Sequence, residues 1–298
     1  MRELLDFSVR SIGIGNYYGF EINKDNLYRT SDGIVHHNSG KSVMEQSIVA
    51  HASHYPDNFQ IVGIDVKQVE FNLLKLVKSV KGVALTVATA AETITAFQQI
   101  MMSRFLFMKD NNVNNIYKLK DKKVKYFHLM GRSWQFDEIF EIQVKFDTTK
   151  GDRETEKLLK MYPDGIQPRI MTIENIYKGM KDGTIKDPVF PKVKGYNPNI
   201  KLEDITITED IYKPKIMIFL ADELNELMTS DDYKSVDQIK YCLGSIARLG
   251  RAAACHLALA CQRASGNTIS SDLMNNIQQA ILLGDFDAGA SQLVFDKD

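Results

Sequence analysis

From residue 39 onward, segments that favour helices alternate with segments that favour strands, and this alternation limits the possible folds more than any other feature. An apolar stripe at helical spacing follows Lys41. Two short apolar runs, Phe59–Ile64 and Val83–Val87, then precede a predicted helix at Glu92–Met108. Strands that alternate with helices form a parallel sheet with helices packed on its faces. The sequence therefore predicts an α/β fold with a parallel sheet.

The middle of the chain interrupts this alternation. Between about Leu119 and Pro214 the periodic pattern is lost, and six of the seven prolines of the chain lie there. Because proline ends helices and is excluded from central strands, this stretch is predicted to be a loop-rich insertion. Beyond it the alternation resumes with one helix, predicted at Val236–Leu249, and three strands, predicted at Ile216–Leu220, His256–Ala260 and Ala280–Leu283.

Residues 1–38 have a third pattern, in which short β-branched or aromatic runs are separated by turn residues. Two such runs are Val9–Ile14 and Tyr17–Ile22. The Asp32-Gly33 pair favours a tight turn between Asn26–Arg29 and Ile34-Val35, which predicts a β-hairpin. We expect this segment to be a small all-β unit ahead of the α/β part.

Composition places the 298-residue chain among ordinary globular proteins, with 44% hydrophobic and 25% charged residues. Its longest apolar stretches, such as Ala252–Cys261, are roughly half as long as a bilayer span, and the N-terminus has no apolar signal core. The three cysteines form no CxxC pair, which argues against a disulfide framework or a zinc site and favours a reducing compartment. The sequence predicts a cytoplasmic chain without a membrane segment, in a bacterial or phage-infected cell.

The first candidate site is the tetrapeptide Ser39-Gly40-Lys41-Ser42. It matches the end of the phosphate-loop pattern GxxxxGK[ST], in which backbone N–H groups hold phosphates, the lysine neutralises them and the hydroxyl binds Mg²⁺. The full pattern needs a strand before the loop and a glycine five residues before Gly40, but that position is Val35. We therefore expect that this loop cannot hold phosphate as it stands. The alternative is that the short tripeptide Gly40-Lys41-Ser42 matches the pattern by chance.

A second candidate site follows the predicted strand Ile216–Leu220, which leads through Ala221 into Asp222-Glu223. Ligands of open α/β sheets bind at the carboxyl ends of the strands. In a nucleotide hydrolase the first acid would hold Mg²⁺ through water, and the second would polarise the attacking water. The next predicted strand delivers Gln262 to the same edge, where it can sense a γ-phosphate. The alternative is a strand end that turns into solvent.

Taken in order, six blocks of the chain resemble the FtsK/SpoIIIE family of DNA translocases. The blocks are Ser39–Val43, Ile64–Glu70, Arg104–Asn115, Ala221–Met228, Arg251–Leu257 and Cys261–Arg263. The resemblance extends from about Ser39 to Gln292 with the insertion left out. It implies a RecA-like P-loop ATPase that uses ATP and Mg²⁺, assembles as a ring, expected to be a hexamer, and pumps double-stranded DNA.

The resemblance also implies a role for each matching residue. Gly40 and Val43 would belong to the phosphate loop, and Lys41 would bind phosphates. Ser42 and Asp222 would hold Mg²⁺, Glu223 would activate water, and Gln262 would be the sensor. Arg251, with Arg248 as its rival, would reach the nucleotide of a neighbouring subunit. The chain departs from the family at Val66, where proline is usual, and at Gln68, where arginine is usual. These departures and the insertion indicate a divergent member, from a phage or a mobile element.

The residues ahead of Ser39 resemble the C-terminal blocks of an intein. The blocks are Gly19–Ile22, Asp25–Tyr28 and Asp32–Ser39, although Asn26 stands where inteins usually have His or Asp. In this chemistry the Asn38 amide attacks its own backbone carbonyl, His37 assists by proton transfer, and Ser39 supplies the nucleophile that takes over the acyl group. The alternative for His36-His37-Asn38 is a polar loop before a helix.

Removal of residues 1–38 and ligation of an upstream glycine-containing segment to Ser39 would restore the phosphate loop. We therefore interpret residues 1–38 as the C-terminal fragment of a naturally split intein and residues 39–298 as a motor domain that lacks its N-terminal part. The expected partner is a polypeptide with the complementary intein fragment and the first part of the ATPase, joined by splicing in trans. Two alternatives remain: a phage terminase-like DNA-packaging ATPase, and a non-splicing degenerate ATPase with an N-terminal interaction module.

Overall fold

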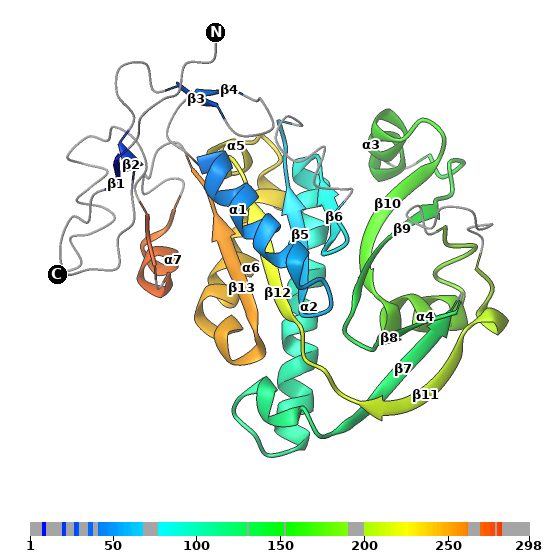
Figure 1. Ribbon diagram of the computed structural model, residues 1–298. Helices are drawn as coiled ribbons and strands as arrows, with labels where there is room; N and C mark the ends of the chain where they lie inside the picture. Colours follow the sequence, from blue (N-terminus) through cyan, green and yellow to red (C-terminus); the bar gives the residue numbers. More distant parts are fainter. Residues whose placement is uncertain are drawn as a thin grey trace, which may run out of the picture.

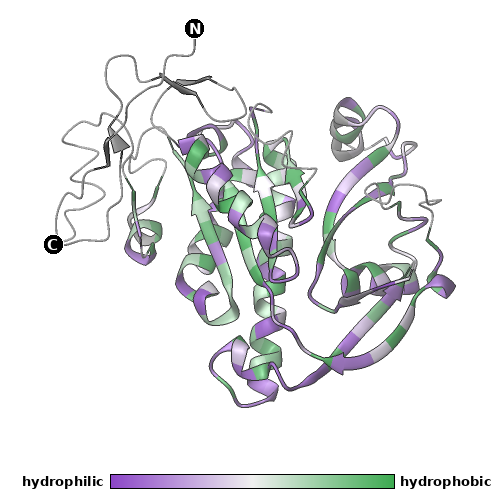
Figure 2. Ribbon diagram, viewed as in Figure 1, coloured by the Kyte–Doolittle hydropathy of each residue, from purple (hydrophilic) through white to green (hydrophobic). Residues whose placement is uncertain are grey.

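A four-stranded parallel sheet forms the centre of the α/β part, in the order β13-β12-β5-β6, which confirms the predicted fold class. The computed structural model describes residues 8–9, 20–21, 27–29, 35–37, 41–67, 77–129, 131–151, 153–189, 200–261, 269–277 and 279–281. The four strands are β5 (Phe59–Ile64), β6 (Val80–Ala84), β12 (Ile216–Ala221) and β13 (Cys255–Leu259). The strands β5, β6 and β12 are largely buried, β13 is only partly buried, and all four are mostly hydrophobic (Figure 2).

Helices cover both faces of this sheet (Figure 1). On one face α1 (Lys41–His54) packs Val49 and Ala52 against Ile61 of β5 and Leu220 of β12. The opposite face is covered by two long helices and two short ones: α2 (Val87–Asp110), α6 (Tyr233–Leu249), α5 (Leu224–Met228) and α7 (Ser271–Asn276). Because alternate residues of a strand point to opposite faces, the sheet has a separate hydrophobic cluster on each side.

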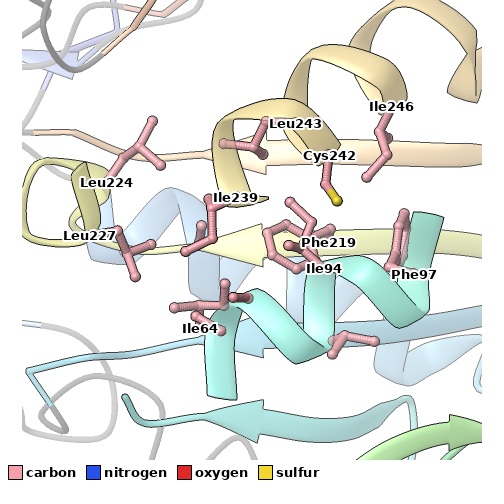
Figure 3. Packing of buried hydrophobic residues seen from close by; sticks show 14 of the residues in the cluster. Ile64, Ile94, Phe97, Phe219, Leu224, Leu227, Ile239, Cys242, Leu243 and Ile246 are labelled. Carbon is pink, nitrogen blue, oxygen red and sulfur yellow. The ribbon is translucent and has the colours of Figure 1, made fainter. Parts of the chain in front are cut away.

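The larger cluster lies between the sheet and the pair α2 and α6 (Figure 3). Phe97 of α2 meets Phe219 of β12 edge to face, with ring centroids 5.6 Å apart. The start of α2 is set by a capping box, in which the Thr86 hydroxyl accepts from the Thr89 backbone N–H and the Thr89 hydroxyl accepts from the Thr86 N–H. This cap explains why Val87, predicted to end a strand, instead begins the helix.

The insertion is not loop-rich, contrary to the prediction. It contains the three-stranded antiparallel sheet β11-β7-β8, the antiparallel pair β9-β10, two α-helices and a hydrophobic cluster of its own. Its elements are η2 (Ile116–Leu119), β7 (Lys123–Leu129), β8 (Arg132–Gln135), β9 (Ile139–Lys145), α3 (Arg153–Met161), β10 (Ile166–Thr172), α4 (Ile173–Asp182), η3 (Leu202–Asp204) and β11 (Thr206–Ile211). Its antiparallel strands mix buried with partly or fully exposed residues, and β11 is exposed throughout, so they lack the continuous apolar runs of the central sheet.

The N-terminal segment forms two short antiparallel pairs apart from the central sheet. One joins β1 (Ser8–Val9) to β2 (Phe20–Glu21). The other joins β3 (Leu27–Arg29) to β4 (Val35–His37), which confirms the predicted hairpin. The strand that directly precedes α1 therefore pairs with β3 rather than with the parallel sheet.

The last predicted strand is wrong where the structure tests it. Ala280 and Ile281 carry no strand, and Leu282 and Leu283 lie outside the described residues.

Within the described part of the chain, no helix combines the length and the apolar character that a bilayer crossing requires.

Candidate functional site

The carboxyl ends of three neighbouring strands meet at one edge of the sheet. Asp65 follows β5, Asp222 follows β12 and Cys261 follows the end of β13. The Asp222 backbone N–H donates to the Ile64 carbonyl at 3.2 Å, and the Ala260 N–H donates to the Ala221 carbonyl at 2.8 Å. Asp65 and Asp222 are both buried, so the site has two carboxyl groups in its floor.

Glu223 is the residue that turns the chain from β12 into α5. Its backbone is left-handed, with φ 52° and ψ 53°, and its N–H donates to the Asp222 carboxylate at 2.8 Å. A left-handed backbone costs a non-glycine residue about 1–2 kcal/mol, and such strain is concentrated at functional sites. The turn keeps the Glu223 side chain at the sheet edge, where it is only 12% exposed.

Two lysines reach the Glu223 carboxylate from different elements. Lys41, in the first turn of α1, places its Nζ 3.8 Å from Glu223 Oε1. Lys67, which follows β5, places its Nζ 3.4 Å from Glu223 Oε2 and 3.8 Å from Glu226. The predicted site residues Lys41, Asp222 and Glu223 are thus brought together. Ser42 and Val43 lie beside Lys41 in α1 and are partly buried.

Lys67 was not predicted as a site residue. The sequence contained a signal for it, because Lys67 comes three residues after the end of β5 and the carboxyl ends of parallel strands share one edge. The argument that selected Asp222 and Glu223 after β12 applies equally to Asp65 and Lys67 after β5. Their proximity to Glu223 depends on the pairing of β5 with β12, which the sequence does not display.

Cys261 is the third contributor to this edge. Burial raises the pKa of its thiol, the Lys41 ammonium acts in the opposite direction, and the Glu223 carboxylate raises it further. The thiol therefore lies within electrostatic reach of both charged groups. Gln262, the next residue, lies outside the described residues, as do Asn38, Ser39 and Gly40.

The family model described as FtsK/SpoIIIE matches residues 4–266. The chain belongs to the FtsK/SpoIIIE family. This agrees with the resemblance seen in the six sequence blocks, and the parallel α/β sheet is consistent with a P-loop ATPase of this family. The match starts at residue 4, so it includes most of the segment interpreted above as an intein fragment.

Solved structures are similar at low identity. The TcpA coupling protein of pCW3 conjugation, in a monomer form with ATPγS, shows 16% identity and a TM-score of 0.47 over 97% of this chain and 69% of that chain. The cytoplasmic domain of the type VII secretion ATPase EccC from Thermomonospora curvata shows 14% identity and a TM-score of 0.46, over 87% of this chain and 21% of that chain. No curated protein matches the sequence.

In this FtsK/SpoIIIE-family chain, Arg251 is not part of the cluster around Glu223. It lies in η4 (Gly250–Ala253), which precedes the amino end of β13, and it is exposed. The five residues of β13 separate η4 from the carboxyl edge, a rise of roughly 16 Å. Arg248, its rival, is exposed in the last turn of α6 at the same amino end.

A second charged cluster, also missed from the sequence, is buried where the insertion joins the sheet domain. Arg104 of α2 is fully buried, and it donates from Nε to Asp137 Oδ2 at 2.8 Å and from Nη1 to the Ala253 carbonyl at 2.7 Å. The Tyr212 hydroxyl donates to the same Asp137 oxygen at 2.7 Å. Burial by itself lowers the pKa of Arg104, but electrostatic interactions with Tyr212 and with the Asp137 carboxylate more than offset this and raise it. The arginine is therefore permanently charged.

The site can supply part of a nucleotide centre. Its cation, hydroxyl and carboxylates fit Mg²⁺ and phosphate chemistry, which prefers oxygen ligands around the metal. Among the described residues, no group of three or more His, Cys, Asp and Glu could hold a metal, so Mg²⁺ would also need phosphate or water oxygens. The loop side fits poorly, because Val35 belongs to a hairpin strand that pairs with Arg29.

Proposed function

We propose that this chain provides the catalytic portion of an ATP-driven motor that moves double-stranded DNA, acting as a subunit of a ring, expected to be a hexamer. The observation that carries the proposal is the meeting of Lys41 with Glu223, 3.8 Å apart, next to the buried Asp222 at the carboxyl edge of a parallel sheet. Membership of the FtsK/SpoIIIE family supports ATP as the substrate.

The proposed roles follow from charge and position. Lys41 binds phosphates, and Ser42 and Asp222 would hold Mg²⁺, which would neutralise charge on the phosphate oxygens. Glu223 accepts a proton from the attacking water, and Lys67 holds its carboxylate in place. Gln262 senses the γ-phosphate, and Arg251 of one subunit acts on the nucleotide of its neighbour.

We propose in addition that the chain acquires this activity only by protein splicing in trans. The supporting observation is that β4, which ends at His37, belongs to a hairpin, and that Val35 occupies the position of the first glycine of the loop. In this proposal residues 1–38 are the intein fragment and residues 39–298 the motor portion. His37, Asn38 and Ser39 carry out the release and ligation described above.

Nucleotide binding tests the first proposal. We expect the spliced product to bind ATP and Mg²⁺ and hydrolyse ATP, and Glu223→Gln to reduce kcat by about 10²–10⁴-fold while binding remains. Lys41→Ala should abolish binding, whereas Lys178→Ala, in an exposed helix of the insertion, should change neither property. The unspliced chain should not bind ATP at micromolar concentration. Micromolar binding by the unspliced chain would contradict the splicing proposal and leave the motor proposal intact.

Mass spectrometry tests the splicing proposal. The chain is mixed with an upstream polypeptide that carries a complementary intein fragment, and a ligated product without residues 1–38 is expected. Asn38→Ala should prevent release of the intein fragment, and His37→Ala should slow it, while the control His51→Ala in α1 should splice normally. Unchanged masses with a matched partner would favour the non-splicing interaction module.

A further inference from the structure

The outer edge of β13 is the side of this strand that faces away from β12. Among the described residues β13 pairs with β12 alone. The Ala254 carbonyl accepts from the Met217 N–H, and the Ala260 N–H donates to the Ala221 carbonyl. Because backbone groups of a parallel strand alternate between its two sides, Cys255, Leu257 and Leu259 direct theirs away from β12.

The direction of the crossovers indicates where a strand that leads into α1 would lie. In sequence, α2 connects β6 to β12 through the insertion and α6 connects β12 to β13, and both helices lie on the same face of the sheet. Both connections therefore move across the sheet from β6 towards β13 (Figure 1). Parallel crossovers are right-handed in about 98% of cases, so a helix on the opposite face must move the chain in the opposite direction.

Helix α1 lies on that opposite face and leads into β5. A strand that feeds α1 must then lie on the β13 side of β5. The two positions on that side are already filled by β12 and β13, so the feeding strand has a place only beyond β13. The strand that precedes α1 in this chain, β4, pairs with β3 and is not in this position.

The geometry points to the outer edge of β13 as the docking site for a parallel strand of the upstream polypeptide, the strand that splicing joins to Ser39. This inference rests on the proposed splicing in trans and extends it, since the two polypeptides would associate through the sheet before ligation. Strand addition of this kind takes its affinity from backbone hydrogen bonds and its specificity from side-chain pockets.

The surroundings of β13 define the chemistry of the incoming strand. On one face Leu257 and Leu259 pack against the cluster of α2 and α6, and on the other Ala258 packs against the cluster beneath α1. A strand between these two layers is covered on both sides, so it should carry five or six consecutive apolar residues. Its carboxyl end would lie at the edge that holds Glu223 and Lys41, where a glycine-containing loop is needed.

Amide hydrogen exchange on the full chain tests this docking site. The probe is a synthetic peptide with six alternating Val and Ile residues followed by Gly-Ser-Gly, which contains no intein sequence. The Leu257 and Leu259 amides should exchange rapidly in the chain alone and at least tenfold more slowly with the peptide, whereas the Ala258 amide should be protected in both. Protection of Leu257 and Leu259 without peptide would mean that another part of this chain covers the edge, and would overturn the inference. Absence of protection with peptide would also overturn it.

A variant pair at one position gives an independent test. Leu257→Pro removes the outward N–H without removing a bond to β12, so it should weaken peptide binding at least tenfold and leave the thermal midpoint within a few degrees. The matched control Leu257→Val retains the N–H and should bind as the wild type does. Equal binding by both variants would exclude strand addition. Because the peptide cannot splice, these results do not depend on whether Asn38 is active.

Discussion

At the residue scale, two charged residues have a free-energy cost of strain or burial that interactions with neighbouring groups offset. Glu223 adopts a left-handed backbone, and its carboxylate lies between two ammonium groups. The fully buried Arg104 is satisfied by one carboxylate and by backbone carbonyl groups. Substitution of such a residue should cause a large loss of stability, because the groups that interact with it lose their partner.

The backbone strain at Glu223 can be measured by two uncharged replacements. Glu223→Gln and Glu223→Gly both remove the carboxylate, but only glycine adopts a left-handed backbone without a Cβ penalty. We expect the glycine variant to be more stable than the glutamine variant by about 1 kcal/mol in urea unfolding. A matched Gln and Gly pair at the exposed, helical Lys240 should show the opposite order. A glutamine variant as stable as the glycine variant would mean that the left-handed turn carries no cost.

Removal of the buried Arg104 side chain should cause a large loss of stability. Arg104→Met leaves the buried Asp137 carboxylate without its cation and should reduce the free energy of unfolding by about 3–5 kcal/mol. Arg248→Met, at an exposed position, should change it by less than about 0.5 kcal/mol. Adding Asp137→Leu to Arg104→Met should recover part of the loss, since no unpaired charge then stays buried. Equal losses for Arg104→Met and Arg248→Met in urea unfolding would contradict the account of this cluster.

At the element scale, how well the sequence predicted each part depended on its environment. The strands β5 and β12 are buried on both faces, so their residues form continuous apolar runs that are visible in the sequence. Strand β7 combines three buried residues with two exposed lysines, so it lacks a continuous apolar run and was interpreted as part of a loop-rich stretch. The contacts of Lys67 with Glu223 and of Arg104 with Asp137 could not be predicted from the sequence, because the partners come from elements distant along the chain.

A close contact between β6 of the central sheet and β10 of the insertion holds these two elements together. Gly82 of β6 faces Ile170 of β10, and a Cβ on Gly82 would lie 2.6 Å from Ile170 Cδ1 and 2.9 Å from its Cγ1. Gly82→Ala should therefore destabilise the protein by roughly 1–3 kcal/mol. In a double-mutant cycle with Ile170→Ala the combined loss should be smaller than the sum of the single losses. Strict additivity in thermal or urea unfolding would show that the two elements do not touch.

At the scale of the whole molecule, the residues with proposed roles in ATP hydrolysis lie at two opposite ends of one sheet. The carboxyl edge holds Lys41, Asp222 and Glu223, while the amino end carries the exposed Arg251 beside the buried Arg104 cluster. That cluster joins α2, the insertion and η4, so the insertion is fixed to the segment that bears Arg251. Since β13 separates the two ends, we expect each subunit of the proposed ring to apply its Arg251 to the nucleotide of a neighbour rather than to its own.

Mixed rings can test whether Arg251 acts between subunits. Spliced Glu223→Gln and spliced Arg251→Ala should each be nearly inactive as ATPases. If each site combines Glu223 of one subunit with Arg251 of the next, random mixing in equal amounts restores both residues at about a quarter of the interfaces, as expected for head-to-tail contacts in a ring. ATPase activity of the mixture should then approach a quarter of the wild-type value.

The same mixture with Arg248→Ala in place of Arg251→Ala separates the two arginines, because Arg248→Ala alone should retain activity. If Arg251 acts within its own subunit, no interface in the first mixture is complete, and the mixture should stay as inactive as its two components.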